Sequence, residues 1–199
     1  YQFPDFPAPK WIYLSSLGET SLGLHDALAT YLDSHPEVKL AFQPGTFQIK
    51  FGTEALKDIY KNTEVFFCNV EEAQHILGEK SRDLKTLLKK MSELGPKTII
   101  ITDGFSGAYA YETKNPEDFW FMPIYPHTPT ERTGAGDAFA STVVSCLALG
   151  KTLEEALAWA PINAQSVAKK IGAQEGLLKP SQIGELLAKA PDTYKLSKI

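Results

Sequence analysis

The sequence predicts an α/β fold, namely a doubly wound, mostly parallel sheet with helices on both faces. Short apolar runs typical of strands alternate with amphipathic segments typical of helices along the 199 residues. One run, Thr98–Thr102, is continuous and β-branched, as expected for a central strand covered on both faces. No repeat of the length that marks solenoids or propellers is visible. Together these observations favour one layered domain.

The first half of the chain repeats a strand-then-helix unit. Trp11–Leu14 is a short apolar run that predicts a buried strand, and after it Leu24, Leu28 and Leu32 recur at helical spacing. The same alternation predicts the elements that follow, which are the strand Val38–Phe42, a short helix over Thr53–Tyr60, the strand Val65–Cys68, and helices at about 70–78 and 82–94.

The second half begins with the central strand and ends in helices. Gly107–Tyr111 and Phe119–Met122 are interpreted as antiparallel additions to the sheet, before helices at about 135–149, 153–170 and 180–189. Residues 1–10 contain three prolines and no period, which indicates a linker or a cut segment. We expect residues 11–190 to form the domain and residues 191–199 to be a C-terminal tail.

Composition and charge exclude several classes of protein. Hydrophobic residues make up 43% of the chain and charged residues 22%, which argues against disorder and coiled coils. The net charge of −4 provides no field to gather nucleic acid. No apolar run approaches the ~20 residues that span a bilayer, and the start of the chain lacks a signal-peptide pattern. We expect a soluble, cytoplasmic protein with no nucleic-acid or membrane partner, and with Cys68 and Cys146 as reduced thiols in apolar stretches.

The segment Thr133–Phe139 carries the most chemistry, because two glycines and an aspartate stand immediately before a long apolar helix. The first N–H groups of a helix lack partners and the dipole is positive there, so small residues let a phosphate approach the backbone. Asp137 is a poor phosphate ligand but a reasonable general base, which indicates a kinase acting on an alcohol. A glycine-rich turn followed by a first-turn carboxylate explains the same spacing.

The heptapeptide Thr133-Gly134-Ala135-Gly136-Asp137-Ala138-Phe139 is similar to the C-terminal signature of the ribokinase-like (phosphofructokinase-B-type) carbohydrate kinases, and that signature is highly specific. The resemblance implies a ribokinase-like fold. It also implies that the backbone amides of Gly134, Ala135 and Gly136 form the anion hole for the transferred phosphoryl group, and that Asp137 takes the proton from the substrate hydroxyl.

A second segment, Asn69-Val70-Glu71-Glu72, resembles the Asn-x-x-Glu motif of the same family. The resemblance implies that Asn69 lies near the nucleotide phosphates and that Glu72 helps to organise Mg²⁺ through water. The residues alone also predict that Asn69 caps a helix and that Glu72 closes a capping box.

A third segment ends the central strand and resembles the Thr-x-Gly-x-x-Gly turn that passes beside the nucleotide. The resemblance places Thr102, Gly104 and Gly107 at the nucleotide. Glycines at this spacing also suit any strand-to-strand turn.

Further positions resemble the part of the family that flanks the adenine, which implies nucleotide-binding roles for Asn163 and Gly172. Many family members hold a monovalent cation, usually K⁺, with an aspartate six residues before the catalytic one. Here that position is Glu131, followed by Arg132 where the family often has threonine, so K⁺ is left open. Arg132 is either a phosphate contact or a solvated loop charge.

The resemblance implies an ATP-dependent phosphotransferase that uses Mg²⁺ and acts on a hydroxyl of a sugar or related alcohol. It covers the C-terminal two-thirds of a family member, so residues 11–190 would be the nucleotide-binding and catalytic portion. The N-terminal strands and the lid over the sugar are expected to be absent, which predicts an inactive or weakly active chain. A homodimer, or association with a missing N-terminal segment, would cover the exposed sheet edge. The alternative is a nucleotide-binding remnant or regulatory partner without turnover.

Overall fold

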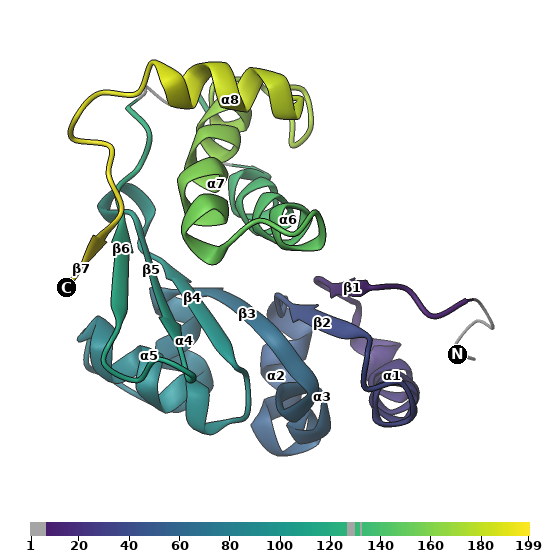
Figure 1. Ribbon diagram of the computed structural model, residues 1–199. Helices are drawn as coiled ribbons and strands as arrows, with labels where there is room; N and C mark the ends of the chain where they lie inside the picture. Colours follow the sequence, from purple (N-terminus) through teal and green to yellow (C-terminus); the bar gives the residue numbers. More distant parts are fainter. Residues whose placement is uncertain (1–6, 127–129, 132) are drawn as a thin grey trace. The chain divides into compact units, whose positions relative to one another are not determined.

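The computed structural model describes residues 7–126, 130, 131 and 133–199, and its elements are labelled in Figure 1. Within these residues one sheet contains β1 (Trp11–Leu14), β2 (Lys39–Phe42), β3 (Thr63–Asn69), β4 (Thr98–Thr102), β5 (Ala108–Glu112), β6 (Phe119–Met122) and β7 (Ser197–Lys198), in that spatial order. The pairs β1–β2 and β2–β3 are parallel, whereas β6 and β7 are antiparallel. The sheet is therefore mixed, and the predicted α/β class is confirmed.

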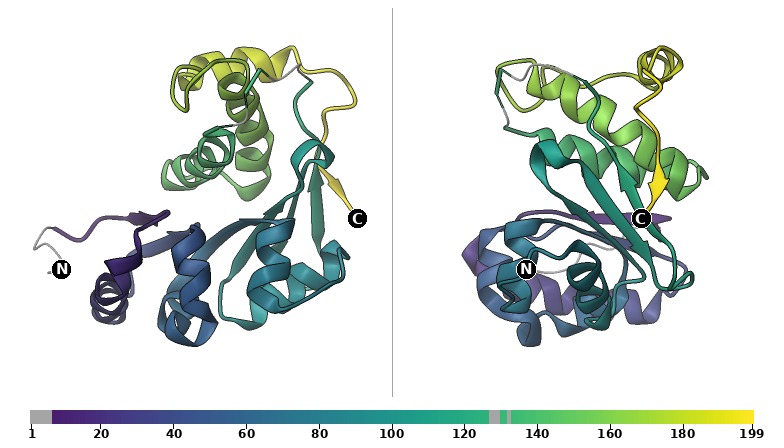
Figure 2. Two further views of the ribbon diagram at one scale, coloured as in Figure 1. Left: turned by 180° about the vertical axis from the view of Figure 1, so that it is seen from behind. Right: turned by 90° about the vertical axis from the view of Figure 1, so that its left-hand side faces the viewer.

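The chain divides into two compact units, of which the first comprises Tyr1–Ile101 and Ala110–Phe119 and the second Thr102–Tyr109 and Trp120–Ile199. The first unit contains η1 (Glu19–Ser21), α1 (Leu22–Ser34), α2 (Thr46–Ala55), α3 (Lys57–Asn62), α4 (Val70–Leu77) and α5 (Leu84–Glu93). The second contains η2 (Gly104–Ser106), α6 (Ala135–Ala148), α7 (Leu153–Ala168) and α8 (Pro180–Ala188). Figures 1 and 2 show α1, α2 and α3 on one face of β1 to β3.

The core of the first unit is built around three fully buried aromatic rings. Phe42 on β2, Tyr60 on α3 and Phe66 on β3 pack with centroid separations of 5.5 to 5.7 Å. Two of the pairs meet edge to face, the arrangement that aromatic quadrupoles favour. Burial raises the pKa of the Tyr60 hydroxyl. These contacts fix α3 against the sheet.

A buried glutamine on α2 ties the loops after β1 and β2 together. The Gln48 Oε1 accepts hydrogen bonds from the N–H groups of Gly45 and Leu17, at 2.7 and 3.2 Å. Its Nε2 donates to the Ser15 carbonyl at 3.1 Å and lies 3.0 Å from His25 Nε2. The carboxamide thus uses all four of its hydrogen-bonding positions, and these bonds offset the free-energy cost of burying a polar group.

The helix predicted over Thr53–Tyr60 is wrong in its extent, because the structure has α2 beginning at Thr46 and α3 ending at Asn62. Gly52, with φ 85° and ψ 164°, kinks α2 between two helical stretches. The start of α2 was missed because its position depends on the buried hydrogen bonds of Gln48. Those bonds join residues far apart in the sequence.

In the second unit, α6 and α7 lie side by side, as both views of Figure 2 show. Their shared surface is closely packed, since Val143, Ala156 and Ala160 are fully buried. Small side chains on α7 let the two helix backbones approach, so the start of α6 is held in a fixed position relative to α7.

Residues 191–199, expected as a tail, contain an ordered contact and a strand. Tyr194 is buried, donates a hydrogen bond from its hydroxyl to the Ala158 carbonyl at 2.6 Å, and packs edge to face on Tyr125. Beyond it, β7 pairs with Trp120 and Phe121 of β6. A strand of two residues has no period that a sequence could reveal.

No helix of the part of the chain that the structure describes is both long and apolar enough to cross a membrane.

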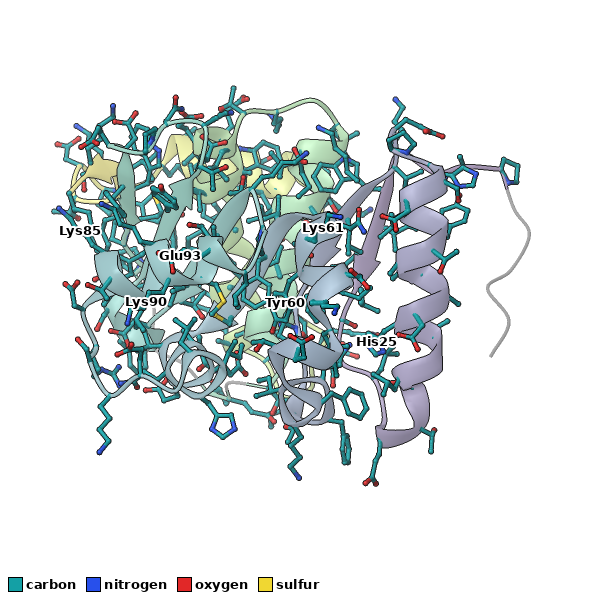
Figure 3. All side chains as sticks on the ribbon, turned by 90° about the horizontal axis from the view of Figure 1, so that it is seen from below. His25, Tyr60, Lys61, Lys85, Lys90 and Glu93 are labelled. Carbon is teal, nitrogen blue, oxygen red and sulfur yellow. The ribbon has the colours of Figure 1, made fainter. Side chains whose placement is uncertain are left out.

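His25 on α1 is the buried partner of Gln48 and is labelled in Figure 3. Its Nδ1 lies 2.8 Å from the Ser21 carbonyl, which can only accept, so Nδ1 carries the proton. Its Nε2 then accepts from the Gln48 amide. Burial lowers the pKa of His25 below its ordinary value of 6.5, although the Ser21 carbonyl and Asp26 oppose that shift. The folded protein therefore favours the neutral ring.

Acidification should destabilise the protein through His25. Because its pKa is lower in the folded chain than in the unfolded one, the stabilisation is complete above pH 6.5 and is lost as the pH falls through the folded value. We expect His25→Gln to flatten the dependence of the unfolding free energy on pH, measured by urea denaturation. The exposed His75, changed to Gln, serves as the control and should keep the wild-type slope. An unchanged slope in His25→Gln would contradict the assignment.

Candidate functional site

The turn before α6 requires glycine at position 134. Gly134 is the N-cap of α6 and has φ 80° and ψ −6°, in the left-handed region. A Cβ at this position would lie 2.7 Å from the Cα, Cβ and carbonyl oxygen of Ala173. Backbone conformation and close approach therefore both exclude a side chain. The turn places the start of α6 directly against the loop that follows α7.

The first turn of α6 presents backbone N–H groups without a side-chain cap. Gly134 makes no side-chain cap hydrogen bond, and the intrahelical series begins with the Ala138 N–H donating to the Gly134 carbonyl at 2.8 Å. The N–H groups of Ala135, Gly136 and Asp137 precede that bond. Together with the positive end of the helix dipole, they form the arrangement that binds anions at helix starts.

Gly136 differs from Gly134 in what a side chain there would meet. A Cβ on Gly136 has no heavy atom within 4 Å, and the residue is exposed. The protein itself does not require glycine at this position. The absence of a side chain instead leaves room for a group that approaches the helix from outside.

Asp137 lies in the first turn of α6 and is exposed. A carboxylate at this position is next to the N–H groups that would hold a phosphate. It is accessible to a hydroxyl that approaches the same helix end, which is the geometry that a general base needs.

An apolar pocket of about 180 Å³ borders the start of α6 and lies entirely within the second unit. It is smaller than the ~300–1,000 Å³ of complete ligand sites, so it fits one ring system rather than a whole nucleotide. Its described lining includes Thr102, Gly104 and Gly107 from the turn after β4, and Ala135 and Gly136 from α6. The structure therefore brings five of the predicted site residues together around one cavity.

The turn that lines this pocket is tight and depends on its glycines. The Asp103 N–H donates to the Gly107 carbonyl at 2.8 Å, which closes the loop around η2. Gly104 and Gly107 have φ of 51° and 101°. A Cβ on Gly107 would lie 2.5 Å from the Met122 carbonyl oxygen, so β5 and the end of β6 approach closely there.

Glu131, which the resemblance places at a cation position, and Gly172, which it places near the nucleotide, are joined directly. The Gly172 N–H donates to Glu131 Oε2 at 3.0 Å. This hydrogen bond and one from the Thr133 side chain lower the pKa of Glu131. The N–H groups of Thr130 and Glu131 both donate to the Ala168 carbonyl. These hydrogen bonds hold the segment before α6 against the end of α7. Arg132 lies outside the described residues.

Asn163 is buried and bridges α6 and α7. Its Nδ2 donates to Thr142 Oγ1 at 2.8 Å, and its Oδ1 accepts from the Leu178 N–H at 2.9 Å. It does not belong to the described lining of the pocket, and neither does Gly172. Both lie close in sequence to lining residues, and their contact with a nucleotide stays a prediction.

Asn69 and Glu72 lie in the first unit, at the junction of β3 and α4. The Asn69 Oδ1 accepts from the Glu72 N–H, and Glu72 Oε2 accepts from the Asn69 N–H, both at 2.8 Å. This reciprocal pair is a capping box, as the residues alone predict. The capping role is therefore confirmed, and the roles toward phosphate and Mg²⁺ stay predictions.

Sequence reasoning assigned no site role to the other described residues that line the pocket, among them Phe105, Pro123 and Gln165. Gln165 follows Pro161 and Ala164 on the same face of α7, so helical spacing from a known lining residue is the only signal that could have found it. Nothing in the sequence marks Phe105 or Pro123 as site residues.

Comparison with known proteins defines the class of protein to which this site belongs. Residues 27–180, more than half of the chain, match the pfkB family of carbohydrate kinases. The chain therefore belongs to the pfkB family. A cytidine kinase of Thermococcus kodakarensis is 33% identical over 119 residues, which cover 60% of this chain and 42% of that protein.

Solved structures share the fold. An Arabidopsis thaliana ribokinase complexed with ribose and ATP has a TM-score of 0.75 and 18% identity, over 89% of this chain and 55% of that one. A protein described as ribokinase II of E. coli, in complex with ATP and Mg²⁺, has a TM-score of 0.75 and 18% identity, over 90% and 59%. The chain thus spans about half the length of the proteins it matches.

The two glycines before Asp137 should respond differently to the same substitution. Gly134→Ala should lower the unfolding free energy by at least about 1–2 kcal/mol, because alanine resists the left-handed conformation and would displace Ala173. Gly136→Ala should leave the unfolding free energy unchanged or raise it, since its Cβ meets nothing and alanine favours a helix. Urea denaturation measures both.

The Gly136→Ala variant also tests whether the start of α6 binds an anion. Gly136→Ala should weaken binding of ATP to the folded chain, measured by calorimetric titration, because the new methyl group occupies the approach to the helix N–H groups. Wild-type ATP affinity in Gly136→Ala would show that this helix start is an ordinary turn.

Proposed function

We propose that the protein is an ATP-dependent kinase that transfers the terminal phosphoryl group to a hydroxyl of a sugar or sugar-like alcohol. The observation that carries the proposal is the position of Asp137, exposed beside an uncapped helix start whose first residues border an apolar pocket. Membership of a carbohydrate kinase family supports it. The chain spans about half the length of the relatives it matches. The acceptor and the activity are therefore proposed for the whole protein.

The residues of α6 divide the chemistry between them. The N–H groups of Gly134, Ala135 and Gly136 would hold the oxygens of the transferred phosphoryl group and stabilise its charge. Asp137 would accept the hydroxyl proton as the oxygen attacks phosphorus. A new O–P bond forms while the bond to the β-phosphate breaks, so the products are a phosphate ester and ADP, with the proton on Asp137.

The pocket and the helix end suit the two ends of ATP. An apolar cavity for one ring system fits the base, and the N–H groups of α6 fit the phosphates. No cluster of three or more acidic, histidine or cysteine side chains exists among the described residues. Mg²⁺ needs no such cluster, because it takes one or two carboxylates and completes its shell with phosphates and water. When bound, Mg²⁺ would neutralise charge on the phosphates.

Three further residues have proposed roles beside the reaction. Asn69 would lie near the phosphates, and Glu72 would hold Mg²⁺ through water. Glu131, whose carboxylate accepts a hydrogen bond from the Gly172 N–H, would contribute to a K⁺ site.

Removal of the proposed base should stop the chemistry and spare the fold. In the complete protein, Asp137→Asn should reduce phosphoryl transfer by about 10²–10⁴-fold, the usual contribution of a general base. ATP affinity should change little, because the backbone N–H groups remain. Coupled-assay turnover and calorimetric titration with ATP measure the two effects. The exposed Asp192, changed to Asn, is the control and should keep wild-type turnover. Near-normal turnover in Asp137→Asn would refute the assignment.

The isolated chain should bind ATP weakly and turn over little or no sugar, because in-line positioning of the acceptor and exclusion of water need groups that the resemblance places outside it. The test is turnover with ATP, Mg²⁺ and a panel of sugars and nucleosides, alone and after addition of the missing N-terminal segment. We expect activity to appear on addition and to favour a sugar. Robust turnover by the chain alone would overturn this expectation, and preference for a nucleoside would overturn the choice of acceptor. ATP binding with no turnover in any mixture would favour a regulatory, nucleotide-binding role.

A further inference from the structure

One polar side chain in the apolar pocket is left without a hydrogen-bond partner. Gln165 on α7 lines the pocket and is only 4% exposed. Its Oε1 is fully buried and accepts no hydrogen bond from any residue that the structure describes. A buried amide group without a partner costs about 1–3 kcal/mol, and most native proteins avoid it.

The other buried carboxamides among the described residues are hydrogen-bonded at both ends, which makes Gln165 an exception. Gln48 forms contacts at all four of its hydrogen-bonding positions, as described above. Asn163, two residues before Gln165 on the same helix, uses both its Nδ2 and its Oδ1. The fold therefore has the means to satisfy a carboxamide on α7. Its failure to do so at Gln165 points to a partner that is not part of the chain.

The surroundings of Gln165 restrict the chemistry of that partner. Apart from Thr102, the other residues described in the lining carry apolar side chains or are glycines. They include Pro123 and also Phe105, which is 52% exposed and whose flat aromatic ring suits the face of a planar group. A ligand that fills this cavity would be an apolar ring with a hydrogen-bond donor on its edge.

We propose that Gln165 selects the base of the nucleotide by accepting a hydrogen bond from the exocyclic amino group of adenine. This inference rests on the proposed function, since it requires that the pocket holds the base of ATP. Adenine presents an amino donor next to a ring acceptor, and a carboxamide matches that pair. A base with a carbonyl oxygen at the same position would place an acceptor against Oε1. Gln165 would then distinguish nucleotides that differ at a single atom.

The test compares ATP with inosine triphosphate, which carries oxygen in place of the amino group. In calorimetric titration of the full chain, wild type should bind ATP at least about tenfold more tightly, a difference of about 1.4 kcal/mol. Gln165→Leu should lose about tenfold in ATP affinity and leave inosine triphosphate unchanged, so that the ratio approaches one. Gln174→Leu, at an exposed glutamine in the same unit, is the matched control and should keep the wild-type ratio.

Thermal unfolding without nucleotide separates this role from a structural one. Gln165→Leu should unfold at the wild-type temperature or above it, because an apolar residue replaces an unpartnered amide. The wild-type comparison of the two nucleotides needs no variant, so the proposal stays testable if Gln165→Leu misfolds. Equal affinity of wild type for both nucleotides, or an unchanged ratio in Gln165→Leu, would overturn the role of Gln165 while leaving the proposed function intact. Binding of neither nucleotide would overturn both.

Discussion

The contact between Gly134 and Ala173 is the constraint on which the candidate site depends. With φ 80° and no room for a Cβ, Gly134 turns the chain directly under the loop after α7 and into α6. The bonds from Thr130 and Glu131 to the Ala168 carbonyl, and from Gly172 to Glu131, hold the same two segments together. Gly136 and Asp137 in the first turn of α6 stay exposed, so the packing that fixes the start of the helix leaves these two residues accessible.

Side chains cap only some of the helix starts that the structure describes, and α1, α2, α3, α6 and α8 have no side-chain cap hydrogen bond. At α4, α5 and α7, the side chains of Asn69, Asp83 and Thr152 accept hydrogen bonds from the first turn. At α6, a glycine occupies the N-cap and supplies no side chain. Such a helix start lacks the roughly 1 kcal/mol that a polar cap provides. It is also the helix start that borders the apolar pocket. The start of α6 without a side-chain cap and the Gln165 Oε1 without a hydrogen-bond partner therefore lie around one cavity. One ligand could provide hydrogen-bond partners to both.

Sequence alone predicted what local patterns encode. Strands such as Thr98–Thr102 and the glycine-rich start of α6 are local, because their period, β-branching and turn residues are contiguous. The early start of α2 was missed since Gln48 is held by residues far away in the chain, and β7 was missed because pairing with β6 creates it. The unpartnered Oε1 of Gln165 is a tertiary property, defined by what the fold does not place beside it. Asn163 lies two residues earlier in the same helix and is hydrogen-bonded through both its Nδ2 and its Oδ1, so residue type could not have separated them.

Under the proposed function, the two parts of the candidate site would use different forces. Burial of a base in the apolar pocket depends on area removed from water and is little affected by salt. A phosphate at the exposed start of α6 depends on charge and on N–H groups that water also reaches, so salt screens it. The apolar part cannot tell one base from another by area alone, because purines bury similar surfaces. Discrimination between them must come from a directional group inside the pocket. Of the described lining, only Thr102 and Gln165 carry one, and Gln165 is the residue whose acceptor the fold leaves open.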